Sequence, residues 1–494
     1  MNNRPRLMIY TNAIVVILVL VYFFALPAVT LIQALNDPGL RSGEIPGFVF
    51  RWHRSLSEDM EQWALDRVSS GRASELDTSD ISGTEWPVFS SVFYLWTTEA
   101  LQEAWEEDPS LADSAPAVYA RGAIEAVTAL VADPNHAAWV VQHWGEDYLD
   151  HENLFYRMLL ISGLTSYQTL LGEDTYETTL RQQVESLADE IDASPYGLLD
   201  DYPGECYPVD ILPAIAAIQR ADEVLGTDHS AFVIRSLRAF EDTRLDPATG
   251  LPAYRCDSFT GEGLGSARGV GISYMLIWAP ELWPETAQEW YHLYEEQFWQ
   301  ESWLAVGFRE FPIQYPYTVS PMGDVDSGPI PFGFGTAASA FGIGAARANG
   351  DFERAYPLSA EALVLAWPLP DGTLLMPRLL SNLTDAPFTG EAALLFTLTR
   401  GSAADNTQGR PSLPFSVYLG LCIYAGIAVG GVILSIKRVG QWEKGRHNSV
   451  AAWQFITWLL LMAFGLGGLL LSCDILGGIL FLAAQFFPRM DRNP

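Results

Sequence analysis

Lysine and cysteine are both scarce in this chain of 494 residues. Lys437 and Lys444 are its only lysines, and four cysteines are too few for a disulfide scaffold of this size. No segment matches the spacing of a zinc site, a P-loop or a GxGxxG dinucleotide-binding loop. We therefore predict no metal site and no cofactor.

Basic residues are few in the middle of the chain. Residues 36–412 contain 20 arginines and 57 acidic residues, whereas the two ends together contain 8 basic and 3 acidic residues. The middle thus has a formal charge of −37 and the ends a charge of +5. Because so acidic a surface repels phosphate groups, we expect no nucleic acid partner.

Long apolar runs occur only at the two ends. Residues 7–35 and 415–436 contain no charged residue, and each run exceeds the roughly 20 residues that cross a bilayer. We predict that both cross a membrane, so that the lipid bilayer is one partner. A cleaved signal peptide is the alternative for the first run, because FALPA resembles a small-residue cleavage site.

Flanking charges predict the topology. Arg4 and Arg6 precede the first run, and a basic cluster at 437–446 follows the second. By the positive-inside rule, the N-terminus and the 437–449 loop are cytoplasmic. Residues 36–412 then lie outside the cytoplasm, and we expect an integral protein of the plasma (inner) membrane in a bacterial envelope.

A third apolar run covers residues 450–487 and contains one acid, Asp474. Residues 450–471 are long enough for one span, whereas residues 475–487 are short for a second. The shorter segment is a fourth span, a re-entrant segment or an interfacial helix. Asp474 is either a functional acid at membrane depth or a turn residue at the interface.

Helical periodicity dominates the middle of the chain from Ser90 onward, since apolar residues recur at three and four positions. Short and long links alternate between these segments, which predicts a repeat of helical hairpins. A closed ring of five or six hairpins, an (α/α) toroid, gathers the long links at one mouth. An open α-solenoid is the alternative. The short links are 172–175, 226–229, 279–286 and 349–351, and the long ones are 193–209, 243–265, 303–328 and 367–389.

We thus predict an all-α chain, an (α/α) toroid with transmembrane helices at both ends. Its parts are an N-terminal transmembrane anchor at 1–35, a membrane-proximal connector at 36–84, the toroid at 85–400, a linker at 401–414, and a C-terminal membrane domain with two or three apolar segments at 415–494.

The long links are rich in carboxylates and aromatic residues, the mixture that sugar-processing sites need for proton transfer and for contact with sugar rings. Helix capping is the alternative role for Asp210 and for one residue of the GDVDSGP motif at 323–329. Cys206 is a nucleophile, a buried thiol or the partner of Cys256 in a disulfide. The catalytic candidates are Glu205, Cys206, Asp210, Asp324 and Asp326.

Further residues of these links are candidates for substrate binding. Arg268 and Arg309 suit a substrate carboxylate or phosphate, with ordinary ion pairing as the alternative. The HxxxDxxxHE stretch at 143–152 is a weak metal motif. The substrate-binding candidates are His151, Glu152, Tyr207, Asp257, Arg268, Arg309 and Glu310.

Four stretches carry a resemblance to a known class: ENLFYRMLLISGLTSYQTLLGEDTYE, PGECYPVDILPAIAAIQRADEVLGTDH, DPATGLPAYR and GDVDSGP. Over residues 115–370 the chain resembles the linalool dehydratase-isomerase-like group, within the six-hairpin glycosidase-like class. The resemblance implies a toroid fold. Linalool dehydratase-isomerase has two active-site cysteines close together in sequence, whereas here only Cys206 falls in a comparable loop.

Three functions remain as hypotheses. The first is an acid–base enzyme acting on a glycan or a similar polyhydroxylated small molecule. The second is a terpenoid dehydratase or isomerase acting on an isoprenoid, whose cationic character aromatic side chains stabilise. The third is a non-catalytic module that binds a ligand or an envelope partner. The sequence does not predict the oligomeric state.

Overall fold

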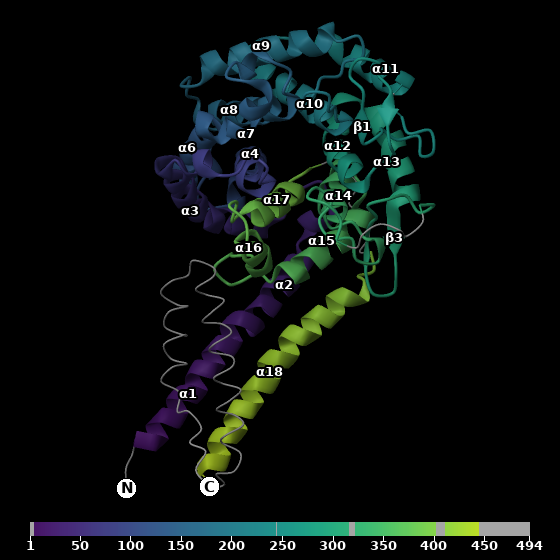
Figure 1. Cartoon of the computed structure of the whole chain (residues 1–494). Helices are drawn as coiled ribbons and strands as arrows, with labels where there is room; N and C mark the ends of the chain where they lie inside the picture. The colour runs from purple at the N-terminus through teal and green to yellow at the C-terminus, as the bar shows by residue number, and fades with distance from the viewer. Residues whose placement is uncertain (1–3, 244, 316–321, 402–410, 444–494) are drawn as a thin grey trace.

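The computed structural model describes residues 4–243, 245–315, 322–401 and 411–443. The described chain is mainly helical, as predicted, and two long helices project from the same side of the folded domain (Figure 1). The predictions for Asp474 and for the apolar run at 450–487 lie outside the described residues.

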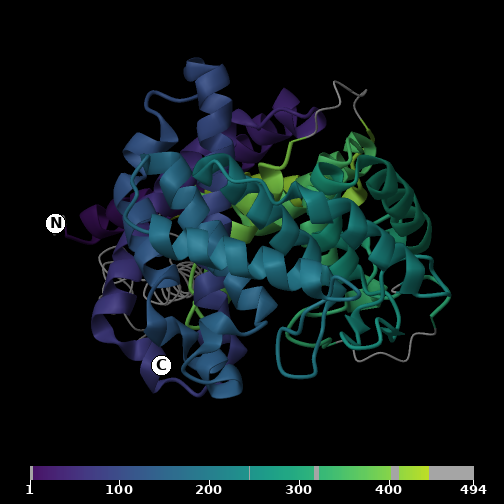
Figure 2. The ribbon, with the colours of Figure 1, turned by 90° about the horizontal axis from the view of Figure 1, so that it is seen from above.

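Six helices of the described chain pack against one another in a closed order. Each packs against the next, and the last packs against the first, so that purple and green segments lie side by side in Figures 1 and 2. These inner helices are α4 (Ile81–Glu107), α8 (Leu154–Leu171), α10 (Pro208–Leu225), α12 (Gly269–Leu282), α14 (Thr336–Ala348) and α17 (Thr389–Leu398).

Apolar side chains on every face explain why the inner helices are buried, as α12 illustrates: all its residues from 269 to 279 are buried. Helix α14 approaches its neighbours closely through glycines. A Cβ atom on Gly342 would lie 2.4 Å from the Phe308 ring, and one on Gly344 would lie 3.0 Å from the Ile277 side chain. The glycine-rich sequence of α14 thus permits close packing in the ring.

A second set of helices covers the inner ones. Each has one apolar stripe, as in α9, where Leu180, Val184, Leu187 and Ile191 are buried. The outer helices are α3 (Gly47–Ser70), α6 (Arg121–Val131), α9 (Glu177–Ala193), α11 (Val233–Thr243), α13 (Pro284–Phe298) and α15 (Phe352–Ala366). Helix α3 packs against α6 and α17, so part of the predicted connector at 36–84 belongs to this outer layer.

Shorter elements complete the domain. The strands form two antiparallel hairpins, one of β1 with β2 and one of β3 with β4. These elements are α5 (Pro116–Tyr119), α7 (Ala138–Trp144), α16 (Leu375–Ser381), β1 (Arg255–Cys256), β2 (Gly263–Leu264), β3 (Trp299–Glu301) and β4 (Val306–Phe308).

The inner helices run in the same direction. Residues near the C-terminal ends of five of them line one cavity of about 400 Å³: Glu103, Arg220, Glu281, Ala348 and Thr399. Their N-terminal ends therefore gather at the other end of the ring. The long links that precede these helices must meet at that same end.

Among the described residues, two helices are long and apolar enough to cross a membrane, over Tyr10–Asn36 and Phe415–Lys437. The first lies within α1 (Arg4–Leu20), the π-helical turn Val21–Ala25 and α2 (Leu26–Asn36). The second lies within α18 (Phe415–Glu443). Helices α1 and α18 pack against each other.

The first apolar run is longer than a membrane requires because its second half belongs to the domain core. Leu31, Ala34 and Leu35 of α2 are buried, and the Tyr356 hydroxyl donates to the Leu35 carbonyl at 3.1 Å. The predicted anchor at 1–35 thus combines a candidate span with a helix that packs inside the folded domain.

Candidate active site

Three long links meet at the N-terminal end of the ring. A disulfide joins Cys206 to Cys256, and the Cys256 amide donates to the Cys206 carbonyl at 2.9 Å. The Tyr254 hydroxyl donates to Asp326 at 2.7 Å, which connects the second link to the third. The long links 193–209, 243–265 and 303–328 thus lie next to one another at these described residues, as predicted.

Three carboxylates from different elements form the centre of this end, and we call Glu85, Asp210 and Asp326 the carboxylate trio. Glu85 lies near the start of α4, Asp210 lies in the first turn of α10, and Asp326 lies in the link before α14. Glu85 and Asp210 are half-buried, whereas Asp326 is exposed. The charge of Asp326 acts on both Glu85 and Asp210, and the charge of Glu85 acts on Asp210.

The pKa values within the trio are raised. Burial raises the pKa of Asp210 to about 8, and repulsion by the charges of Asp326 and Glu85 adds to the effect. Burial also raises the pKa of Glu85 to about 7, against a hydrogen bond from Tyr202 that lowers it. The Asp210 side chain keeps some solvent contact, so it is an accessible acid that stays largely protonated at neutral pH.

Tyrosines surround the trio. The Tyr202 hydroxyl donates to Glu85 at 2.6 Å, and the Tyr254 hydroxyl donates to Asp326. Tyr274 is buried near Asp210. Burial raises the pKa of Tyr274, and the charge of Asp210 raises it further. The rings of Tyr207 and Tyr254 lie edge to face, with centroids 5.7 Å apart. The trio thus lies among aromatic faces and hydroxyl donors.

A fourth acid, Asp201, lies behind the trio. It is buried, and its carboxylate accepts from the Phe155 amide in the first turn of α8 at 2.8 Å. Burial raises the pKa of Asp201, and the charge of Asp210 raises it further. Asp201 thus accepts an amide at the start of α8, and burial together with Asp210 opposes its own ionisation.

An ion-pair network fixes the third link. Arg268 Nε donates to Glu310 at 2.7 Å, its terminal nitrogens contact Asp324 at 2.9 and 3.0 Å, and its guanidinium lies 4.4 Å from the Tyr254 ring centroid. Burial works to raise the pKa of Asp324, but hydrogen bonds from Arg268 and Ser327 outweigh it and lower the pKa to about 2. The network ties the link of Asp326 to the start of α12.

This network changes three predicted roles. Asp324 is a permanently ionised partner of Arg268, so it is poorly suited to the proton transfer predicted for it. Arg268 uses its donors on two carboxylates, so its ion-pairing alternative is the one observed. Glu310 is fully buried and also accepts from the Val270 amide at 3.3 Å, which makes it a structural residue and not a surface for substrate.

Of the three roles predicted for Cys206, the disulfide with Cys256 is the one observed, and it leaves no free thiol to act as the predicted nucleophile. Glu205, another catalytic candidate, lies outside the trio. It accepts from the Tyr207 hydroxyl at 2.7 Å and lies 3.8 Å from Arg255. The first of these contacts also occupies the hydroxyl of the predicted binding residue Tyr207.

The remaining binding candidates hold local structure. His151 stacks on Trp144, and its Nε2 lies 3.4 Å from Asp147. Glu152 accepts from the Asp200 amide at 2.6 Å. Among the described residues, no group of three or more histidines, cysteines or carboxylates is placed to hold a metal ion.

Two other candidates order links. Asp257 accepts from the amides of Phe259 and Thr260, both at 2.9 Å, and so closes a turn. Arg309 donates to the Phe311 carbonyl at 3.1 Å and to Gln300.

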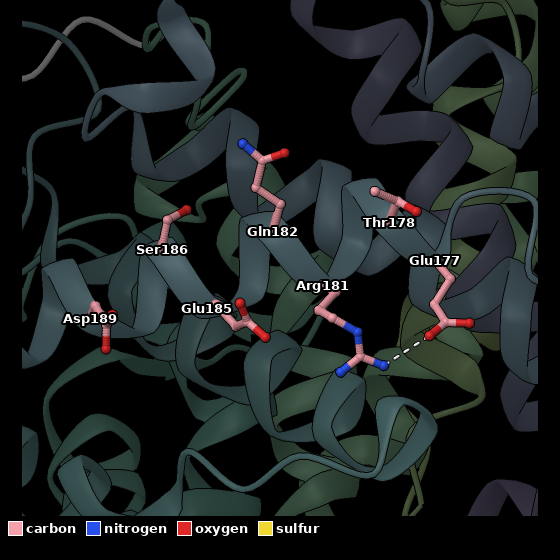
Figure 3. Close-up of a pocket in the computed structure, with 7 residues that line it drawn as sticks. All are labelled: Glu177, Thr178, Arg181, Gln182, Glu185, Ser186 and Asp189. Carbon is pink, nitrogen blue, oxygen red and sulfur yellow. Dashed lines mark hydrogen bonds and ion pairs between the residues drawn. The ribbon is translucent and has the colours of Figure 1, made fainter.

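Two surface hollows lie away from the trio. One, of about 460 Å³, follows the outer face of α9, where Glu177 and Arg181 form an ion pair at 2.8 Å (Figure 3). The other is the cavity at the C-terminal ends of the inner helices, where Arg220 contacts Glu281 at 2.7 Å and Glu99 at 3.9 Å. Each hollow thus contains an ion pair among its lining residues.

Sequence reasoning missed Glu85, Asp201 and three tyrosines of the site. Glu85 is the one acid in the segment ISGTEWPVFSSVFYLW, and an acid within so apolar a helix is a usable signal. Tyr202 and Tyr254 lie in links that the sequence analysis singled out, but nothing in their spacing indicates which carboxylate each contacts.

Neither a protein-family model nor a curated protein matches this sequence. The site is therefore assigned from its geometry.

Proposed function

We propose that the six-helix ring is an (α/α) toroid of the six-hairpin glycosidase-like class, and that the carboxylate trio is its acid–base centre. The substrate class we assign is a glycan or a similar polyhydroxylated molecule. The observation that carries the proposal is Asp210, a solvent-accessible acid with a pKa of about 8 beside the exposed carboxylate of Asp326. Closed contacts between α17 and α4 support the toroid over an open solenoid.

The roles follow from protonation. Asp210 donates its proton to the leaving oxygen as the glycosidic C–O bond breaks. Asp326 accepts a proton from the water that attacks the anomeric carbon, so the two carboxyl groups exchange roles and water is consumed. Repulsion by Asp326, with a smaller part from Glu85, adds to burial in holding Asp210 in its protonated form.

The tyrosines suit a sugar. Tyr207 and Tyr254 are half-buried and lie edge to face beside the Asp326 carboxylate that Tyr254 contacts, so they supply aromatic surface for a sugar ring. A terpenoid lyase that used Cys206 would need a free thiol, which the disulfide removes. The glycan assignment is therefore the one that the residues support.

The disulfide also supports the proposed topology. Disulfides persist in oxidising compartments, and this one lies in the segment expected outside the cytoplasm. We propose that α1 and α18 anchor the chain in the plasma membrane with a cytoplasmic N-terminus. A reporter active only in the cytoplasm and fused near residue 250 should give no signal; a strong signal there overturns this topology.

The enzymatic test is a screen of oligosaccharides and polyols with the purified full chain, read as release of new reducing ends. Asp210→Asn and Asp326→Asn should each lower turnover at least 100-fold, whereas Glu205→Gln should retain it. Glu205 is the matched control because it lies in one of the long links that form the site but outside the trio. Equal turnover in all three variants contradicts the assignment, and a cavity that binds sugars without turnover favours the non-catalytic alternative.

A further inference from the structure

Some exposed apolar side chains of the described chain belong to segments that contact the two candidate spans. The turn between β3 and β4 carries Trp303 and Leu304, which are 78% and 40% exposed. In Figure 1, β3 lies on the lower part of the domain, close to the start of α18. This turn therefore lies next to one of the two candidate spans.

Direct contacts fix the turn to that helix. The Trp303 ring lies 5.7 Å from the ring of Phe415, the first residue of α18, and the Ser416 amide donates to the Leu304 carbonyl at 2.9 Å. Glu361 of α15 accepts from both the Val306 amide and the Ser416 hydroxyl. The exposed tryptophan is thus held at the point where the apolar helix leaves the domain.

The end of α15 makes the corresponding contact with the first candidate span. Trp367 Nε1 donates to the Phe23 carbonyl at 2.7 Å, and the Tyr22 hydroxyl donates to Asp371 at 2.6 Å. Leu365, two residues before Trp367, is 73% exposed. Helix α16 follows this segment and lies on the same side of the domain in Figure 1. Leu380 on α16 and Leu383 just beyond it are 62% and 81% exposed.

We propose that these side chains form a membrane-contact face that rests on the bilayer surface beside the two spans. The face consists of Trp303, Leu304, Leu365, Leu380 and Leu383. The inference rests on the proposed membrane insertion of α1 and α18, because continuity with these helices is what identifies the bilayer as the occupant. Tryptophan favours the membrane interface, where its ring is buried and its N–H remains hydrated.

Charge argues for the same kind of contact. The domain is strongly acidic and contains no lysine, so anionic headgroups repel it. Insertion of apolar side chains into the bilayer surface is then the interaction that can hold the domain against lipid. Its strength should vary little with salt, unlike that of a basic surface patch.

The test places an environment-sensitive fluorophore at single positions of the full chain in lipid nanodiscs. Cys422 and Cys473 are first replaced by serine, and the Cys206–Cys256 disulfide is kept. Trp303→Cys and Leu383→Cys report on the face, Ile427→Cys reports on α18, and Ile234→Cys on the outer helix α11 reports on solvent. Ile427 and Ile234 are 41% and 64% exposed, so each can be labelled.

Labels at residues 303 and 383 should emit at shorter wavelength in nanodiscs than the free fluorophore does in buffer. Lipids that carry a nitroxide on the headgroup should lower their emission at least twofold, and lipids that carry it on the acyl chain should quench the label at residue 427. The label at 234 should remain unquenched. Quenching at 427 without quenching at 303 and 383 overturns the membrane-contact face but leaves the anchor intact. Absence of quenching at 427 overturns the anchor, and the face with it. A label at 303 that is shielded from buffer but not quenched by lipid indicates a protein contact and also refutes the proposal.

Discussion

Replacing Asp210 with asparagine removes a titrating group while keeping the size of the side chain. In the folded protein, burial together with the charges of Asp326 and Glu85 raises the pKa of Asp210 to about 8, whereas the unfolded chain releases this proton at about pH 4. Between these values the unfolded state binds fewer protons than the folded state, so the free energy of unfolding falls as the pH rises. The wild-type protein should therefore be less stable at pH 8 than at pH 5.

The magnitude follows from the shift. Three pH units correspond to about 4 kcal/mol at roughly 1.36 kcal/mol for each pKa unit. Because Asp210 retains solvent contact, water screens part of this cost, and we expect about 2 kcal/mol. Asparagine has no charge to bury. The free energy of unfolding of Asp210→Asn should thus exceed that of the wild type by about 2 kcal/mol more at pH 8 than at pH 5.

The assay is denaturant unfolding of the full chain in detergent, followed by tryptophan fluorescence at both pH values. The Glu205→Gln variant is the control, since it removes a half-buried carboxylate that lies outside the trio and near Arg255. A gain for Asp210→Asn that is equal at both pH values, or larger at pH 5, refutes the raised pKa. Full turnover in this variant would separately refute the catalytic role.

Three further perturbations test the surroundings of the trio. Tyr202→Phe removes the hydrogen bond that lowers the pKa of Glu85, so this pKa should rise further. The pH–rate profile should then shift toward higher pH, and an unchanged profile contradicts the contact. Arg268→Ala leaves Glu310 buried without its cation and should cost about 3–5 kcal/mol of stability, whereas Arg268→Ala combined with Glu310→Gln should recover much of the loss in thermal unfolding. Replacing Cys206 and Cys256 together by serine should cost about 2–5 kcal/mol and lower turnover, and a variant of unchanged stability would show that the disulfide does not order the site.

Helical periodicity predicted the helical character of the domain. The alternation of short and long links predicted that the long links meet at one end of the hairpins. Both are properties of sequence spacing. The extent of the first span was not predictable in this way, because an apolar run reads alike whether lipid or protein covers it. Residues such as Leu31 and Leu35 are buried by α15, which lies more than 300 residues later in the chain.

The site was harder to predict because a carboxylate's role depends on its partner. Asp324 and Asp326 are two residues apart, yet the first pairs with Arg268 and the second accepts from Tyr254. Their composition and spacing are the same for either role. Only the position of the Arg268 guanidinium, which comes from a different link, separates the ionised structural acid from the candidate base.

That separation also explains why an acid can stay protonated at this end of the ring. Helix N-termini stabilise negative charge, so the positions of Glu85 and Asp210 alone would lower their pKa values. Both pKa values are raised, so burial and mutual repulsion outweigh the helix dipoles. An arginine that paired with the trio would reverse this balance. Because Glu310 and Asp324 hold the Arg268 guanidinium instead, its charge fixes the link of Asp326 without neutralising the acid that the proposed reaction requires.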